Sequence, residues 1–394
     1  FCYDQEPLNF DIYNSRETVK NREKLFYDYV GEENKVNNPI GSNLFQRKNI
    51  AGHPLVNSSV YDKKLLLHSE KNSDDLKKYE NNGFLGIYYW AHAFIALDWY
   101  RFAKHDRTLV SGFNNFFNKD FNIYCRSWSG YREYRLKFLS KLQSRQISEK
   151  TNVFFNEYDS GNHYFDYEIK EKHWRLSEKE KNNIKEINYI NNNHSDPTLS
   201  ASYNSDNYKE SAIDVVLETV FDKNKIQLTE KIFRPIACGK PFILVSEKKS
   251  LDYLKSYGFK TFGDLIDESY DLISNPIDRM NKIIGTMKKI SDLPKKEKEN
   301  LFSEMHRIAE YNRKWFFSED FFNIIDQELR KNLFEKIRQL DNPNNQTSKE
   351  LNLTYRSYKR YKKFFSGIQN IIAEEIISET LERIELSRKN IGKY

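Results

Sequence analysis

The sequence has little cysteine: Cys2, Cys125 and Cys238 are the only three in 394 residues. Because they lie far apart and form no CxxC spacing, neither a disulfide framework nor a thiolate zinc site is indicated. The sequence also lacks any apolar run near the roughly 20 residues that span a bilayer, and its first residues lack the basic-then-apolar pattern of a secretion signal. We therefore expect a cytoplasmic protein with no membrane partner.

Large aromatic side chains, by contrast, are plentiful, and the 28 Phe, 26 Tyr and 5 Trp can fill a substantial core. The chain is longer than one domain of roughly 100 to 200 residues, so we expect two domains and a helical extension. The net charge of +6 favours an anionic ligand, for which a nucleotide diphosphate and a nucleic acid are both suitable.

The first 165 residues alternate short apolar stretches with segments whose apolar residues recur every three or four positions. The predicted strands are 1–3, 64–68, 121–125 and 152–156, and the predicted helices are 74–80, 88–104 and 131–144. Strands that alternate with helices indicate a mostly parallel sheet that is covered on both faces.

A polar stretch from 173 to 208 has the composition of an exposed linker or insertion. We therefore predict an N-terminal α/β domain at 1–175, a linker or insertion at 176–208, a second α/β domain at 209–290 and a helical extension at 291–394. The second domain should run strand, helix, strand, helix, at 213–219, 228–238, 241–245 and 250–257.

The first helix of this second domain begins with residues that suit a pyrophosphate. A strand that leads into a helix N-terminus presents unpaired N–H groups and the positive end of the helix dipole. Thr229 would cap this helix, Glu230 would accept hydrogen bonds from ribose hydroxyls, and Lys231 would reach a diphosphate oxygen. Arg234, one turn later, would add a second cation on nearly the same face.

The same helix resembles a known donor site. Its Thr-Glu-Lys, followed by Pro-Ile-Ala-Cys-Gly at 235–239 and an apolar strand, is similar to the donor motif of GT-B glycosyltransferases, closest to the alpha-1,3-fucosyltransferase type. A more specific resemblance, over about 210–290, is to glycosyltransferase-like proteins of bacteriophage genomes, whose short motifs follow in the same order. Those motifs are Thr-Glu-Lys at 229–231, Pro-Phe-Ile at 241–243, Ser-Leu and Leu within 250–254, Gly-Phe-Lys-Thr-Phe at 258–262 and Asp-Glu-Ser-Tyr-Asp at 267–271.

This resemblance implies an α/β protein of GT-B type, in which two Rossmann-like domains face a cleft. It also implies that Glu230 and Lys231 contact the donor nucleotide, with Glu218 on the preceding strand end as a further candidate.

The fucosyltransferase pattern also has an arginine at the start of a helix, which balances the diphosphate charge as the leaving group departs. The matching stretch at 123–135 offers Arg126, Arg132 and Arg135 but lacks the family's Ser-Asn before that arginine. We favour Arg132 and Arg135 for this role, because both can project from the first turns of the helix.

Sugar transfer with inversion needs a group that takes the proton from the acceptor hydroxyl. Parallel sheets bind ligands beyond the carboxyl ends of their strands, so we take Glu6 and Glu70 as candidate bases, with Asp4 and His68 as helpers. The histidines show no HxxxH spacing that would hold a metal ion. A helix dipole with Lys and Arg side chains can do the work of that ion.

We therefore expect a metal-independent, inverting glycosyltransferase that needs no cofactor and takes a nucleotide-diphosphate sugar as its donor. A glycan and a modified base in phage DNA are both suitable acceptors, and a phage-encoded enzyme would act in the host cytoplasm. Two alternatives stay open. One is a noncatalytic α/β protein that binds nucleic acid or another polyanion through the basic and aromatic residues at 355–365. The other is a nucleotide-sugar epimerase or hydrolase.

Overall fold

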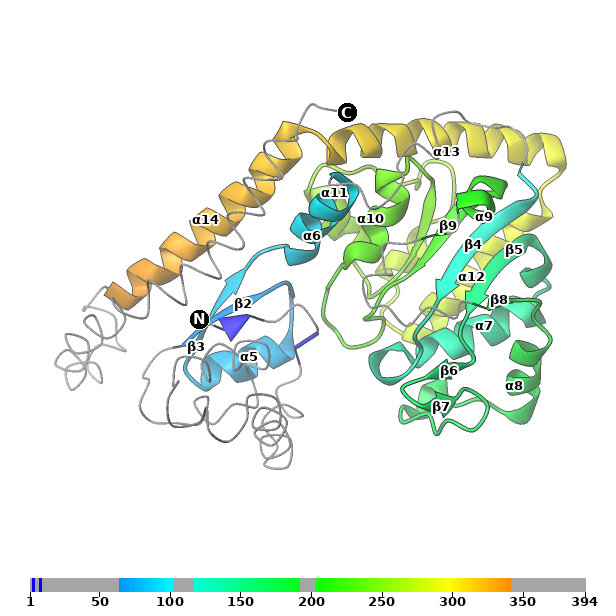
Figure 1. The fold of residues 1–394 in the computed structure, drawn as a ribbon, viewed down its shortest axis with the longest axis horizontal. Coiled ribbons are helices and arrows are strands. Elements are labelled where there is room, and N and C mark those ends of the chain that lie inside the picture. The colour runs from blue at the N-terminus through cyan, green and yellow to red at the C-terminus, as the bar shows by residue number, and fades with distance from the viewer. Residues whose placement is uncertain are drawn as a thin grey trace, which may run out of the picture. The chain divides into compact units, whose positions relative to one another are not determined.

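A computed structural model of the chain describes residues 2–3, 7–8, 64–101, 117–191, 203 and 205–341. The protein is of α/β class with parallel sheets, as the sequence predicts. It forms two compact units (Figure 1). The first consists of Phe1–Phe94 and Asn323–Asn390, and the second of Ile95–Phe322 and Ile391–Tyr394.

The first unit contains a parallel sheet in the order β1-β2-β3, formed by Cys2–Tyr3, Lys64–His68 and Phe84–Tyr88. The helix α5, Asp74–Asn81, connects β2 to β3 and is capped by the side chain of Ser73. The sequence predicts β2 and α5 correctly but assigns Tyr88 to a helix and misses β3. The next helix, α6, spans only Ala91–Arg101.

Gly86 in the middle of β3 explains why this strand is hard to recognise from the sequence. Glycine weakens strand propensity, but the space around this position is tight. A Cβ atom at Gly86 would lie 3.0 Å from Leu76 Cδ1 and 3.1 Å from His68 Nε2. The close approach of α5 and β2 therefore favours glycine at position 86, and this glycine makes β3 hard to recognise from the sequence.

The second unit is built on a sheet of five described strands in the order β10-β9-β4-β5-β8, and every neighbouring pair is parallel. In chain order they are β4 Lys119–Cys125, β5 Thr151–Phe155, β8 Ile190–Asn191, β9 Ser211–Leu217 and β10 Phe242–Val245. The chain moves outward from β4 through β5 to β8, then returns to place β9 on the other side of β4. This is the order of the first five strands in a doubly wound dinucleotide-binding sheet, with its switch point between β4 and β9.

Helices connect and cover these strands. They are α7 Tyr134–Ser144, α8 Glu178–Lys185, α9 Ser205–Glu210, α10 Glu230–Ala237, α11 Ser250–Ser256, α12 Pro276–Asp292 and α13 Lys295–Phe316. The helix α14, Glu319–Asp341, belongs to the first unit from Asn323 onward. A short hairpin, β6 Tyr158–Asp159 with β7 Asn162–His163, follows β5. None of the helices within the described ranges combines the length and the apolar character that a bilayer crossing requires.

The domain division predicted from the sequence is wrong. The strands β4 and β5, which we assigned to an N-terminal domain at 1–175, pair in one sheet with β9 of the predicted second domain at 209–290. The predicted two Rossmann-like domains therefore do not correspond to these segments, because the sheet that contains the switch point uses both of them.

The stretch 176–208, which we predicted to be a linker or insertion, contributes elements to the second unit in its described part. It contains α8, whose N-terminus has a capping box formed by Ser177 and Glu180, and β8 at the sheet edge. The helix α8 packs on α7 and buries Ile184. The run of Lys, Glu and Asn that we interpreted as an exposed linker is the solvated face of an amphipathic helix.

The predicted helical extension at 291–394 is helical through its described part, but α13 is integral to the second unit. It packs on α10 (Figure 1), where Phe316 stacks on Phe233 with ring centroids 5.0 Å apart. Trp315 donates a hydrogen bond from Nε1 to the Tyr257 carbonyl at 2.7 Å. This packing fixes the position of α10 relative to the sheet.

Candidate functional site

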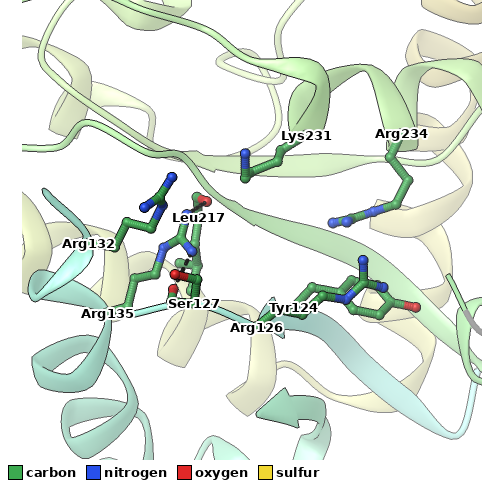
Figure 2. Close-up of a pocket in the computed structure, with 8 residues that line it drawn as sticks. All are labelled: Tyr124, Arg126, Ser127, Arg132, Arg135, Leu217, Lys231 and Arg234. Atoms are coloured by element: carbon green, nitrogen blue, oxygen red, sulfur yellow. Dashed lines mark hydrogen bonds between the residues drawn. The ribbon is translucent and has the colours of Figure 1, made fainter. Parts of the chain in front are cut away.

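A cavity of about 100 Å³ opens in the second unit at the carboxyl ends of β4 and β9 (Figure 2). Its lining residues come from the end of β4 and the loop after it, the 3-10 helix before α7, the first turn of α7, the end of β9 and α10. They are Tyr124, Arg126, Ser127, Arg132, Arg135, Leu217, Lys231 and Arg234. The crevice at a switch point is where ligands bind in open α/β sheets. Five of the eight lining residues are cationic, so the cavity is suited to an anion.

The helix α10 begins at this cavity with the cap that the sequence predicts. Thr229 is the N-cap residue, and its Oγ1 accepts a hydrogen bond from the Lys231 N–H at 3.4 Å. The same hydroxyl donates to Glu218 Oε2 at 2.6 Å, while the Thr229 N–H donates to Glu218 Oε1 at 3.1 Å. The carboxylate of Glu218 thus ties the end of β9 to the start of α10.

Glu218 has 0% exposed surface and does not appear in the cavity wall. Its Oε2 also accepts a hydrogen bond from the Thr219 N–H at 3.3 Å. Both carboxylate oxygens are therefore engaged within the protein, and this geometry suits a residue that positions the helix cap.

Lys231 reaches the cavity from the first turn of α10. Its Nζ lies 2.7 Å from Glu230 Oε1, 3.1 Å from Thr229 Oγ1 and 3.5 Å from Thr219 Oγ1. The ion pair with Glu230 is largely buried. The ammonium group is therefore held at the helix N-terminus, where the helix dipole adds to its attraction for anions.

Arg135 links the ends of the two central strands. Its Nη1 donates to the Ser127 carbonyl beyond β4 at 2.6 Å, and its Nη2 donates to the carbonyls of Leu217 and Glu218 at 2.6 and 2.9 Å. Tyr134 adds a bond from its hydroxyl to the Glu218 carbonyl at 2.5 Å. The guanidinium of Arg135 thus stays at the cavity while it joins β4 to β9.

Arg132, the other arginine that we favoured, lies at the end of a short 3-10 helix at Gly130–Arg132 and lines the cavity. The preceding loop is shaped by Asp159. Its Oδ2 accepts hydrogen bonds from the Trp128 and Ser129 N–H groups at 2.7 Å each. Although burial opposes it, these bonds hold the pKa of Asp159 below its ordinary value.

Arg234 lines the cavity, and it also forms a buried ion pair with Asp214. Its Nε and Nη2 donate to Asp214 Oδ2 at 3.0 and 2.9 Å, and both side chains are buried. Burial alone would lower the pKa of Arg234, but the charge of Asp214 raises it above its ordinary value. Asp214 in the middle of β9 was not predicted from the sequence, because an acidic residue inside an apolar strand gives no sign of its partner.

Arg126 and Tyr124 are further cavity residues that the sequence analysis did not select. The Arg126 guanidinium lies 4.6 Å from the centre of the Tyr124 ring, and the Arg234 guanidinium lies 4.3 Å from the same centre. Burial and the charge of Arg234 lower the pKa of Arg126 to about 10. Arg126 was one of the three arginines that the stretch 123–135 offered, and its position directly after β4 brings it to the switch point.

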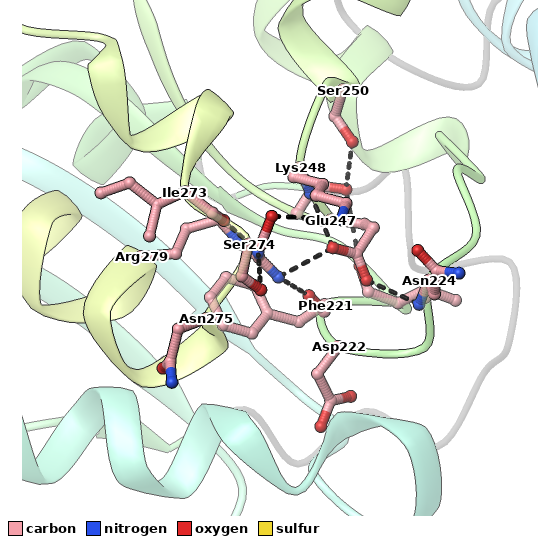
Figure 3. Close-up of polar contacts among 12 residues, drawn as sticks. Phe221, Asp222, Asn224, Glu247, Lys248, Ser250, Ile273, Ser274, Asn275 and Arg279 are labelled. Atoms are coloured by element: carbon pink, nitrogen blue, oxygen red, sulfur yellow. Dashed lines mark hydrogen bonds and ion pairs between the residues drawn. The ribbon is translucent and has the colours of Figure 1, made fainter.

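The loop that leads from β9 to α10 is anchored by Arg279 at the start of α12 (Figure 3). This guanidinium donates to the Phe221 carbonyl, donates to the Ile273 carbonyl at 2.7 Å and pairs with Glu247 Oε1 at 3.0 Å. Glu247 Oε2 in turn accepts a hydrogen bond from the Asn224 N–H at 2.8 Å. The path from Glu218 to Thr229 is thereby fixed from the side of α12.

Of the two candidate bases, only Glu70 lies among the described residues. Glu6 and its helper Asp4 lie outside the described residues. Glu70 is buried in the first unit, where its Oε1 accepts a hydrogen bond from the Leu8 N–H. The imidazole of His68 accepts a hydrogen bond from the Glu70 N–H at 3.3 Å, and burial lowers the pKa of His68 to about 4.

The basic and aromatic stretch 355–365 also lies outside the described residues. Within the described part of the chain, no three His, Cys, Asp or Glu side chains gather as they would around a metal ion. Comparison with protein-family models, with curated proteins and with solved structures found no match. The interpretation of the cavity therefore depends on its own geometry and charge.

Proposed function

We propose that the protein is a GT-B-type glycosyltransferase whose second unit holds a nucleotide-diphosphate sugar in the cationic cavity. The observation that carries this proposal is the convergence of five cations with the N-terminus of α10 at the switch point of a doubly wound sheet. Oriented N–H groups and fixed cations are the features that bind a pyrophosphate. The order of short motifs shared with phage glycosyltransferase-like proteins adds support.

In this proposal Lys231 and Arg132 contact the diphosphate, and Glu230 accepts hydrogen bonds from the ribose. Arg135 has its donors directed to main-chain carbonyls, so it contributes its charge while it braces the strand ends. Glu218 and Thr229 position the helix start. Arg234 contributes from one turn further along α10.

The chemical step would be a displacement at the anomeric carbon with inversion. The bond from that carbon to the diphosphate oxygen breaks as the acceptor oxygen attacks, and negative charge develops on the leaving diphosphate. The cations around the cavity stabilise this charge without a metal ion or another cofactor. The acceptor would be a glycan or a modified DNA base, Glu6 and Glu70 stay the candidate bases, and the enzyme would act in the cytoplasm of a host cell.

The donor site is tested by calorimetric titration of UDP-, GDP- and dTDP-sugars into the wild type and into Lys231→Ala. We expect one nucleotide class to bind and Lys231→Ala to weaken it at least about tenfold, or about 1.4 kcal/mol. Lys288→Ala is the matched control, because Lys288 pairs with Asp292 on the exposed side of α12. Absence of nucleotide binding, or equal binding by both variants, would contradict the proposal.

A further inference from the structure

The five cations of the cavity fall into two groups (Figure 2). Arg132, Arg135 and Lys231 lie toward the first turns of α7 and α10. Arg126 and Arg234 lie together beside the Tyr124 ring. A diphosphate at the start of α10 lies beside the first group, and the second group lies in the same cavity, beside another part of such a ligand.

The arrangement around Tyr124 places two like charges close together in a partly buried site. The ring face attracts both guanidinium groups, and Asp214 pairs with Arg234. Even so, burial and the charge of Arg234 lower the pKa of Arg126. An anion bound between the two arginines would relieve this repulsion, because an opposite charge stabilises the protonated form.

The chemistry of the donors indicates the kind of anion. Guanidinium groups carry a fixed positive charge and planar N–H donors that match a carboxylate or a phosphate. Arg234 directs Nε and Nη2 to Asp214, so it would contribute mainly its charge, beside the guanidinium of Arg126. None of the described residues that line the cavity is acidic, so the cavity wall has no negative charge that would repel such a group.

We propose that Arg126 and Arg234 form a second anion subsite, which binds a carboxylate on the transferred sugar. Both groups of cations line one cavity of about 100 Å³, so the second anion must lie close to the diphosphate. The sugar is the part of a donor that is bonded directly to the diphosphate, and an acidic sugar has its carboxylate within a few bonds of it. This inference rests on the proposed function and narrows its donor to nucleotide derivatives of acidic sugars.

The test compares donors that differ only in the oxidation state of one sugar carbon. Glucose and glucuronate esters of UDP and of dTDP, and mannose and mannuronate esters of GDP, are titrated calorimetrically into the full chain. We expect the acidic member of at least one pair to bind at least about tenfold more tightly than the neutral member. Arg126→Gln should abolish this preference, so that the acidic and the neutral member of the pair bind with equal affinity.

Arg132→Gln is the matched control, because it removes a cation from the other group and should weaken both members of a pair equally. Arg126→Lys retains the charge without the planar fork, so it should retain only part of the preference and serves if Arg126→Gln fails to fold. Equal affinities within every pair, with the nucleotide bound, would overturn the second subsite and leave the donor site standing. A preference that survives Arg126→Gln would overturn it too, and failure of every nucleotide to bind would overturn the proposed function itself.

Discussion

At the scale of single residues, the cavity of the second unit is shaped by two buried carboxylates, Glu218 and Asp214, which do not line it themselves. Glu218 accepts hydrogen bonds from Thr229 and Thr219, and Asp214 pairs with Arg234. From the sequence we interpreted Glu218 as a donor contact and Arg234 as a diphosphate cation. The partner of each side chain lies 11 or 20 positions away and appears only on folding.

Glu218→Gln tests the positioning role of this carboxylate. The side-chain amide of glutamine would place an N–H donor where the carboxylate now accepts hydrogen bonds from the Thr229 and Thr219 N–H groups. A buried N–H group that loses its hydrogen bond costs about 1–3 kcal/mol. We expect urea denaturation to show a loss of stability of this size, together with several-fold weaker nucleotide binding. Glu230→Gln is the comparison, since Glu230 pairs with the cavity residue Lys231, and it should lower nucleotide affinity with a smaller loss of stability. Wild-type stability in Glu218→Gln would contradict the role.

At the scale of elements, the sequence predicts most strands and helices of the second unit, because their apolar periodicity is local. It fails on α8 and on the pairing of β4 with β9. The helix α8 buries little besides Ile184, so its composition resembles a linker. The contact between Ile123 and Val215 joins positions 92 residues apart, and no local pattern encodes it. The helix start at Thr229 was predictable because caps are local, whereas the choice of Arg126 among the three arginines of 123–135 required knowledge of the strand order.

The packing of α13 on the second unit requires glycine at position 258. This residue has a φ of +87°, and a Cβ atom there would lie 2.6 Å from Trp315 Cζ2. We expect Gly258→Ala to destabilise the protein by about 2 kcal/mol or more, from backbone strain and displacement of the indole.

Gly285 offers the matched control, because it lies within α12 and a Cβ atom there would meet nothing within 4 Å. Gly285→Ala should raise stability by up to about 1 kcal/mol through helix propensity. Urea denaturation of the two variants measures both effects. Changes of the same sign in the two variants would show that the Trp315 contact does not govern the response at Gly258.

At the scale of the whole molecule, the two compact units differ in the titratable groups that they bury. In the first unit, burial lowers the pKa of His68 from 6.5 to about 4. A histidine with a lowered folded-state pKa binds fewer protons when folded, so its contribution to stability is lost as the pH falls from 6.5 toward 4. In the second unit, burial raises the pKa of Asp271 from 3.8 to about 6. Because the folded protein binds the Asp271 proton more tightly than the unfolded chain does, the contribution of Asp271 to stability increases as the pH falls through 6.

Acidification from pH 7 to pH 5 should therefore weaken the first unit through His68, by about 2 kcal/mol at 1.36 kcal/mol per pH unit below 6.5. Hydrogen exchange of peptides from 64–88 and from 211–245, measured at both pH values, reports the two units separately. In His68→Gln the acid-induced loss of protection at 64–88 should largely disappear, because glutamine does not titrate. The protection at 211–245 should be unchanged by this substitution. An acid response at 64–88 that persists in His68→Gln would show that another group of the first unit controls its stability.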